Sequence, residues 1–245
     1  MDPSDPRREF IDRYASTHSA HFAERDAAWY AQRERFFHHR LSAFLPEDRG
    51  AAILDAACGA GELLHYLLSR GYRSAEGVDL SAEQIAQARA SGLANVRQAD
   101  MFVHLEESAS RYDLIVASHV IEHLHKSEAV RCLRALRHAL RPGGRMLVLT
   151  PNAGSPLGIG YSFGDFTHEV HFTAMSLAQV AAMADLSVVH LGGVRPDPAG
   201  LRGRLRRAAW DLLLAPALGA VLGDRRMRYG SVMEPELIGV FTSGS

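Results

Sequence analysis

The sequence is poor in cysteine, in net charge and in long apolar runs. Its 245 residues include two cysteines, Cys58 and Cys132, which cannot build a disulfide framework and lack the spacing of zinc ligands. A reducing, cytoplasmic environment is therefore expected. The formal net charge of -1 gives no basis for nucleic-acid binding. The first eight residues are polar and carry no apolar signal-peptide core.

The longest apolar stretch, residues 210–222 (WDLLLAPALGAVL), is too short to span a bilayer and contains Asp211 and Pro216. Arginines flank it on both sides. Two interpretations remain open: a peripheral contact of residues 200–228 with the inner membrane face, or a dimer contact or sheet cap with a solvated basic face. The chain is expected to be a monomer or a homodimer. The flanking arginines are Arg202, Arg204, Arg206 and Arg207 before the stretch, and Arg225, Arg226 and Arg228 after it.

Hydrophobic residues make up 47% of the chain and charged residues 22%, which is typical of a globular domain. After an aromatic-rich helix expected over residues 8–45, short apolar runs alternate with helical segments. This order indicates βαβ units and a parallel sheet. Strands are predicted at 53–54, 75–78, 95–99, 113–117, 145–150, 187–191 and 237–242, with the last at the sheet edge; helices are predicted at 62–70, 126–140 and 175–184, a further helix begins after Ser81, and residues 152–165 are expected to form a loop.

Local signals refine this arrangement. Ser81 and Gln84 have the spacing of a capping box at the start of a helix. Residues 141–144 (RPGG) are expected to stop the preceding helix. The sequence therefore predicts an N-terminal helical lid over 1–50 and one domain over 51–245, with an insertion at 194–235 before the last strand.

A glycine-bearing turn follows the first predicted strand, in ILDAACGAGELL. Gly59 and Gly61 allow a tight turn and the close approach of a ligand to a helix start. A dinucleotide fingerprint requires a small residue where Leu64 stands, and Glu62 places negative charge where a phosphate would lie. The turn therefore favours a ligand without phosphate, and Asp55 before it suits a cationic amine.

This segment resembles motif I of the class I S-adenosylmethionine-dependent methyltransferases, with Ala57 at the usual first glycine. Further motifs follow in order: GVDLS, NVRQADMF, YDLIVASHVIEHL and LRPGGRMLVLTPN. The resemblance implies an α/β, Rossmann-like doubly wound, mostly parallel seven-stranded sheet. It implies S-adenosylmethionine as cofactor and S-adenosylhomocysteine as product. Asp79 would accept the ribose hydroxyls and Asp100 the adenine amino group. The implied cofactor-binding residues are Asp55, Ala57, Cys58, Gly59, Gly61, Asp79, Leu80, Asp100, Met101, Phe102 and Ser118.

Histidines gather in two places, SHVIEHL and GDFTHEVHFT. An oxygen acceptor usually needs a general base, whereas an amine needs only to arrive deprotonated. His168 is the first candidate for the base and His123 the second, with Asp165 as an orienting partner. Substrate contacts are predicted for His119, His171, Tyr14 and Tyr30.

Several alternatives stay open. His119, Glu122 and His123, with His168 or His171, resemble the Glu-x-x-Glu-His metal site of some O-methyltransferases, but His119 replaces the first glutamate, so a divalent metal is not expected. The principal prediction is an O-methyltransferase acting on a small-molecule, sugar or glycan, or lipid-linked acceptor, without nucleic acid. The rivals are an N-methyltransferase on an amino sugar or amine, and an inactive cofactor-binding regulatory protein. A nicotinamide oxidoreductase is disfavoured by Leu64.

Overall fold

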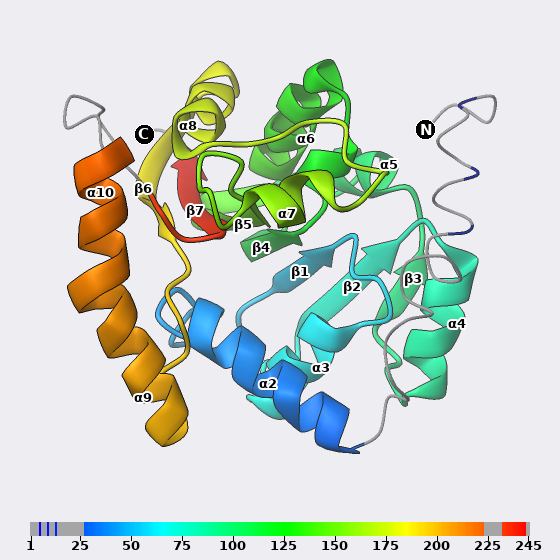
Figure 1. Cartoon of the computed structure of the whole chain (residues 1–245). Helices are drawn as coiled ribbons and strands as arrows, with labels where there is room; N and C mark the ends of the chain where they lie inside the picture. The colour runs from blue at the N-terminus through cyan, green and yellow to red at the C-terminus, as the bar shows by residue number, and fades with distance from the viewer. Residues whose placement is uncertain (1–4, 6–8, 10–12, 14–26, 223–231, 244–245) are drawn as a thin grey trace. The chain divides into compact units, whose positions relative to one another are not determined.

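The computed structural model describes residues 5, 9, 13, 27–222 and 232–243 (Figure 1). A seven-stranded sheet has the order β3-β2-β1-β4-β5-β7-β6 and is flanked by helices. The chain divides into two compact units, residues 1–118 with 134–147 and residues 119–133 with 148–245. No helix in the described ranges has the length and apolar character needed to cross a membrane. The predicted α/β fold with a seven-stranded sheet is confirmed.

The first unit contains four parallel strands that end at one edge. Ala56 pairs with Val78, and Asp79 pairs with Gln98, so the acidic residues at the strand ends come to the same edge as predicted. The strands are β1 (Ile53–Ala56), β2 (Ala75–Asp79), β3 (Val96–Gln98) and β4 (Tyr112–Ser118); the helices after the first three are α3 (Glu62–Ser69), α4 (Ala82–Ala90) and α5 (Met101–Glu106), of which α5 was not predicted.

The N-terminal helix is described from Ala27 to Leu41 as α2. It packs on α3, where the Phe37 ring stacks on the Tyr66 ring and the His38 side chain hydrogen-bonds the Tyr66 hydroxyl at 3.2 Å. Leu41 is fully buried. The described part of this helix is thus core packing on α3, and its predicted role as a lid over the acceptor stays a prediction.

The predicted capping box at α4 forms only in part. The Ser81 hydroxyl accepts a hydrogen bond from the Gln84 backbone N–H at 3.3 Å, as expected. The Ser81 backbone N–H does not donate to the Gln84 side chain, because it donates to Asp79 Oδ1 at 2.8 Å. Asp79 therefore replaces the Gln84 side chain as the acceptor in the capping box. This hydrogen bond joins the start of α4 to the end of β2.

The second unit differs from the predictions at three points. The last strand is not at the sheet edge but lies between β5 and β6. Its residues 237–241 are all buried, whereas β6 exposes Ser187, Val189 and His190. The segment 152–165 contains a short helix, and β5 begins already at Leu140. The elements are η2 (Ile121–His123), β5 (Leu140–Pro151), α7 (Ile159–Phe163), α8 (Ala174–Met183), β6 (Leu186–Gly193), α9 (Gly200–Ala209), η3 (Trp210–Leu214), α10 (Ala215–Leu222) and β7 (Glu236–Ser243); α6 (Lys126–Ala139) and β5 each have residues in both units.

Candidate active site

The turn after β1 has the backbone of a ligand cradle. Ala57, Gly59 and Gly61 have φ values of 60°, 55° and 82°, in the left-handed region. Gly61 at φ 82° would be strained with any L side chain, and a Cβ there would lie 2.3 Å from Leu93 Cδ1, so glycine is favoured. Ala57 adopts the same left-handed conformation with a side chain, which explains why glycine is usual at this position of the motif and why alanine is still accommodated.

Asp79 holds this turn to the end of β2. Its Oδ2 accepts a hydrogen bond from the Gly59 backbone N–H at 2.8 Å, while Oδ1 accepts from Ser81. Burial raises the pKa of Asp79, and the two backbone N–H groups oppose that rise. Each carboxylate oxygen has a second lone pair. The carboxylate is therefore oriented and retains acceptor capacity for a ligand diol.

Asp55 is the residue of this turn whose surroundings best suit a cationic ligand group. The residue is 2% exposed, and its Oδ2 has no hydrogen-bond partner among the described residues. Burial raises the pKa of Asp55 well above its usual value, and the charges of Glu62 and Asp79 raise it further. Buried Asp55, with the negative charges of Glu62 and Asp79 beside it, suits a ligand bearing ammonium and sulfonium charges. The same charges would repel the pyrophosphate of a dinucleotide.

The other predicted cofactor residues lie around the same strand ends. Asp100 begins α5, where its Oδ1 accepts a hydrogen bond from the Phe102 backbone N–H at 2.8 Å. Cys58 is buried, and burial raises the pKa of its thiol. The remaining predicted positions are Met101, which is buried, and Leu80, Phe102 and Ser118, which are half-buried.

Replacing Asp79 with alanine is expected to weaken S-adenosylmethionine binding by about tenfold or more, because a ribose acceptor and the hydrogen bond to Gly59 are both lost. Titration calorimetry of the purified chain measures this directly. Exposed Glu83 on α4 provides the control, since Glu83→Gln removes a nearby surface carboxylate without touching the turn. Equal affinity in the Asp79 variant would show that the carboxylate does not bind the ribose.

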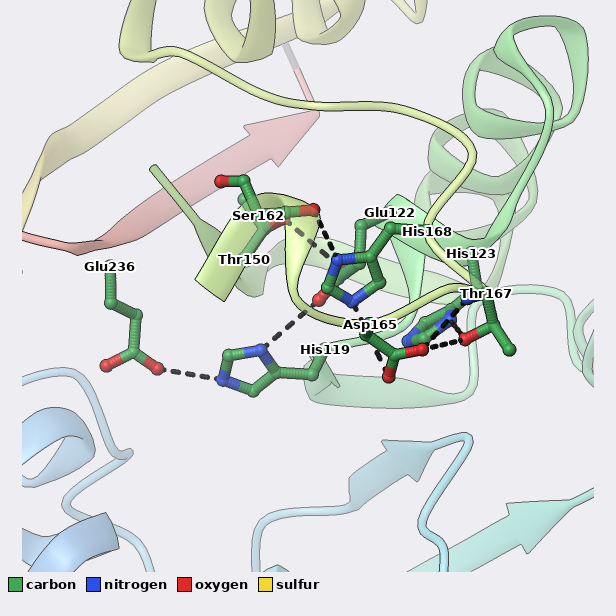
Figure 2. A network of polar contacts seen from close by, with 9 residues as sticks. All are labelled: His119, Glu122, His123, Thr150, Ser162, Asp165, Thr167, His168 and Glu236. Carbon is green, nitrogen blue, oxygen red and sulfur yellow. Dashed lines mark hydrogen bonds and ion pairs between the residues drawn. The ribbon is translucent and has the colours of Figure 1, made fainter. Parts of the chain in front are cut away.

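A second group of polar residues surrounds η2 in the other unit (Figure 2). His119 has a left-handed backbone with φ 54° and a side chain held between two carboxylates. Its Nδ1 lies 3.2 Å from Glu122 Oε1 and its Nε2 lies 2.8 Å from Glu236 Oε1. Burial lowers the pKa of His119, but the hydrogen bonds and charges of both carboxylates outweigh it and raise the pKa to about 10. His119 is therefore an imidazolium with both N–H groups engaged.

Glu122 is the buried centre of this group. The residue is 1% exposed, and its Oε2 accepts a hydrogen bond from the Thr150 hydroxyl at 3.1 Å. Burial raises its pKa, but the hydrogen bond and charge of His119 lower the pKa below the usual value. The Glu122 carbonyl accepts hydrogen bonds from the backbone of Glu169 and Val170. Glu122 is thus an ionised carboxylate that also fixes the segment carrying the second pair of histidines.

His123, Thr167 and Asp165 form a hydrogen-bonded chain. The Thr167 hydroxyl donates to Asp165 Oδ1 at 2.7 Å, so its oxygen can only accept from His123 Nδ1, which lies 2.8 Å away. This assigns the proton to Nδ1, so Nε2 is the nitrogen that carries the lone pair of the neutral ring. Burial is the largest cause that lowers the pKa of His123, and the charge of His168 lowers it too. We call these three residues the relay.

His168 lies beside the relay, its ring centroid 4.7 Å from that of His123. Its Nδ1 donates to the Ser162 carbonyl at 2.9 Å, so its Nε2 also carries a lone pair in the neutral form. That Nε2 is 4.0 Å from Asp165 Oδ2. His171 stacks on Phe163, and its buried Nδ1 has no hydrogen-bond partner in the described part of the chain.

The structure brings together four of the residues predicted for catalysis and substrate binding, namely His119, His123, Asp165 and His168. Tyr14 lies outside the described residues. The Tyr30 hydroxyl donates to Ser91 Oγ at 2.6 Å in the first unit, and its ring lies against His65. Thr167 was not singled out from the sequence, although it stands inside the segment that carries Asp165 and His168. Glu236, 117 positions from His119, gives no sequence signal at all.

The metal alternative can be compared with this geometry. Glu122, His123 and His168 each offer one ligand atom within 4.8 Å of the others. His119 cannot ligate as an imidazolium. Both oxygens of Glu122 already accept hydrogen bonds, from His119 and from Thr150. As it stands, the group has the chemistry of a hydrogen-bonded base beside an ion pair whose carboxylate, Glu122, is buried.

Residues 29–191 match the family described as a methyltransferase domain. Among curated relatives, the chain is 34% identical over 187 residues to a ubiquinone biosynthesis O-methyltransferase of Methylocella silvestris, covering 67% of this chain and 71% of the relative. It is 28% identical over 165 residues to the enzyme of the same name from Aeromonas salmonicida, covering 61% and 68%.

Solved structures agree on the fold. A SAM-dependent methyltransferase of Archaeoglobus fulgidus superposes with a TM-score of 0.62 at 17% identity, covering 88% of this chain and 99% of that one. A Burkholderia thailandensis N1-methyltransferase with bound S-adenosylhomocysteine superposes with a TM-score of 0.56 at 19% identity, covering 98% and 87%. The carboxylates and the glycine turn of the first unit fit the same cofactor. The chain belongs to the methyltransferase-domain family and is an S-adenosylmethionine-dependent methyltransferase.

Proposed function

We propose that the chain methylates an oxygen atom of a small-molecule, glycan or lipid-linked acceptor, with His123 as general base. The relay is the observation that carries this proposal. A hydroxyl must lose its proton as its oxygen attacks the methyl group, and His123 Nε2 holds the lone pair that can take it. When bound, S-adenosylmethionine supplies an electrophilic methyl group on a sulfonium. A neutral amine acceptor would not need such a base.

The relay prepares His123 for this role in two ways. The hydrogen bond from Nδ1 to Thr167 fixes the tautomer and the ring orientation. The Asp165 carboxylate, reached through the Thr167 hydroxyl, stabilises the imidazolium that forms when Nε2 takes a proton. A positive charge on His168 lowers the pKa of His123, which favours the neutral form that can take a proton. His168 Nδ1 faces only a neutral carbonyl, which is why we place it second, in the reverse of the sequence-based order.

The neighbouring residues then take supporting roles. We infer that His119 positions Glu122 and Glu236 rather than accepting a proton, because both of its N–H groups are already engaged. His171, with an unpartnered buried Nδ1, is the hydrogen-bonding group we assign to the acceptor. The names of the curated relatives, which include a malonyl-[acyl-carrier protein] O-methyltransferase of Pectobacterium atrosepticum, support oxygen as the acceptor atom.

The test is a panel of paired acceptors incubated with S-adenosylmethionine, each hydroxyl compound matched by its amine analogue, with S-adenosylhomocysteine formation as the readout. We expect turnover of hydroxyl acceptors, with a rate that rises as His123 loses its proton, and no loss of activity in EDTA. Turnover of the amines alone would favour N-methylation. Loss of activity in EDTA that zinc or magnesium restores would favour the metal alternative. Tight cofactor binding without turnover of any acceptor would favour a regulatory protein.

A further inference from the structure

The insertion before β7 contains one continuous helix, residues 200–222, formed by α9, η3 and α10 (Figure 1). One side of it is anchored. Trp210 is buried, and its Nε1 donates to Glu234 Oε1 at 3.3 Å. Gly203 is buried too, where a Cβ would lie 2.6 Å from the Asp197 carbonyl oxygen. Gly203 and Trp210 are seven positions apart, so they define the inward face of the helix.

The outward face is apolar. An α-helix advances about 100° per residue, which places Leu201 and Leu205 of α9 nearly opposite Gly203. Leu212 lies in η3, which is a π-helix, and is exposed as well. The exposed fractions of these three leucines are 67%, 61% and 73%. An amphipathic helix of a globular protein normally turns its apolar side inward. Here a leucine row faces solvent in the described structure, together with the exposed Leu213, Leu214 and Val221.

Positive charge borders this row. Arg202 and Arg204 lie on either side of it by the same helical spacing, and Arg206 follows on the Arg202 side. All three are exposed, and none has an ion-pair partner among the described residues. Asp211, the one acidic residue of the 200–222 sequence, is already paired with Arg207 at 2.8 Å. The free charge of this face is therefore entirely positive.

We propose that residues 200–222 bind the surface of an anionic lipid membrane, with the helix lying in the membrane plane. The leucines enter the interface while the bordering arginines meet anionic headgroups. A twofold dimer centred on this face would set its arginines against the same arginines of the second copy. Nucleic acid would satisfy the arginines but leave the leucines in water. Only an anionic apolar surface suits both residue types.

The experiment is vesicle flotation of the whole 245-residue chain. The vesicles contain phosphatidylcholine alone or phosphatidylcholine with phosphatidylglycerol. We expect flotation only with the anionic vesicles, and weaker flotation in high salt. The double substitution Arg202→Gln/Arg204→Gln should lower the partition coefficient roughly 30-fold. The matched control, Arg73→Gln/Arg145→Gln, removes two exposed arginines elsewhere and should float like the wild-type chain.

The leucine row is tested separately with Leu201→Ser/Leu205→Ser, which keeps every charge and should lower the partition coefficient roughly 100-fold. Absence of flotation with anionic vesicles overturns the proposal. The proposal is also overturned if light scattering shows that the wild-type chain is a homodimer and that the leucine substitutions convert it to a monomer. If the wild-type chain and the leucine variant bind duplex DNA with equal affinity, the face would be assigned to nucleic-acid binding. None of these readouts depends on methyl transfer, so the outcome is independent of the proposed function.

Discussion

Replacing His123 with alanine is expected to lower turnover by roughly 10²-fold or more, while S-adenosylmethionine affinity stays unchanged. The variant removes the Nε2 lone pair that we assign to the acceptor proton, but it leaves the carboxylates of the first unit in place. The measurement compares kcat at saturating cofactor with cofactor affinity from calorimetry. His138→Ala is the matched control, because His138 is an exposed histidine on α6. A fall in cofactor affinity equal to the fall in kcat would indicate a structural role instead.

Substitutions of Thr167 test whether the relay supports the role of His123 as general base. Thr167→Val keeps the shape but removes the hydroxyl that joins His123 to Asp165, whereas Thr167→Ser keeps the hydroxyl. Without the relay the imidazolium is less stable, so the pKa of His123 falls further. The acid limb of the kcat profile should then move to lower pH with a lower plateau in Thr167→Val, and Thr167→Ser should restore it. If His168→Ala abolishes turnover while His123→Ala does not, the base is His168.

The substitution Asp55→Asn is expected to have opposite effects on binding and on stability. S-adenosylmethionine affinity should fall between roughly 10-fold and 100-fold, because a charge-assisted contact to the ligand amine is lost. The cofactor-free chain should nevertheless unfold at a higher temperature at pH 8. Burial and the charges of Glu62 and Asp79 disfavour the ionised carboxylate, and a neutral amide of the same shape removes that penalty.

The sign of the pH dependence follows from the raised pKa. An aspartate in the unfolded chain ionises near pH 3.9, whereas folded Asp55 holds its proton to higher pH. Its contribution to stability is present below about pH 4 and is lost as pH rises through the folded pKa. The cofactor cation favours the ionised form, so wild-type affinity should increase with pH and binding should release a proton. Calorimetry in buffers of different ionisation enthalpy measures that proton. A wild-type chain with no proton release would contradict the assignment.

Much of the first unit could be predicted from the sequence because its signals are local. A short apolar run that ends in an aspartate defines a buried parallel strand, and the glycine turn follows within a few residues. Parallel pairing then brings Asp55, Asp79 and Asp100 to one edge without further information. The capping box was wrong in its second half because Asp79 accepts the hydrogen bond of the Ser81 backbone N–H.

The second unit was harder to predict because its contacts join distant positions. The order of β6 and β7 depends on which strand is buried on both faces, and short apolar runs do not distinguish the two. The histidines were identified from their clustering, but their protonation follows from partners that no spacing reveals. His119 is charged because Glu122 pairs with it and Glu236 pairs with it as well, from 117 positions away. The preference for His123 as the general base likewise rests on the hydrogen bond that the Thr167 hydroxyl donates to Asp165.

The anchoring of the 194–235 insertion limits how it can be exchanged between relatives. Its first residue, Val194, donates its backbone N–H to the Glu236 carbonyl, and the Asn152 side chain donates to the Val232 and Glu234 carbonyls. Glu236 follows directly and holds His119. The insertion is therefore held in place by residues that lie outside its own bounds. A chimera that grafts it onto another methyltransferase must carry Asn152, Glu236 and His119 with it.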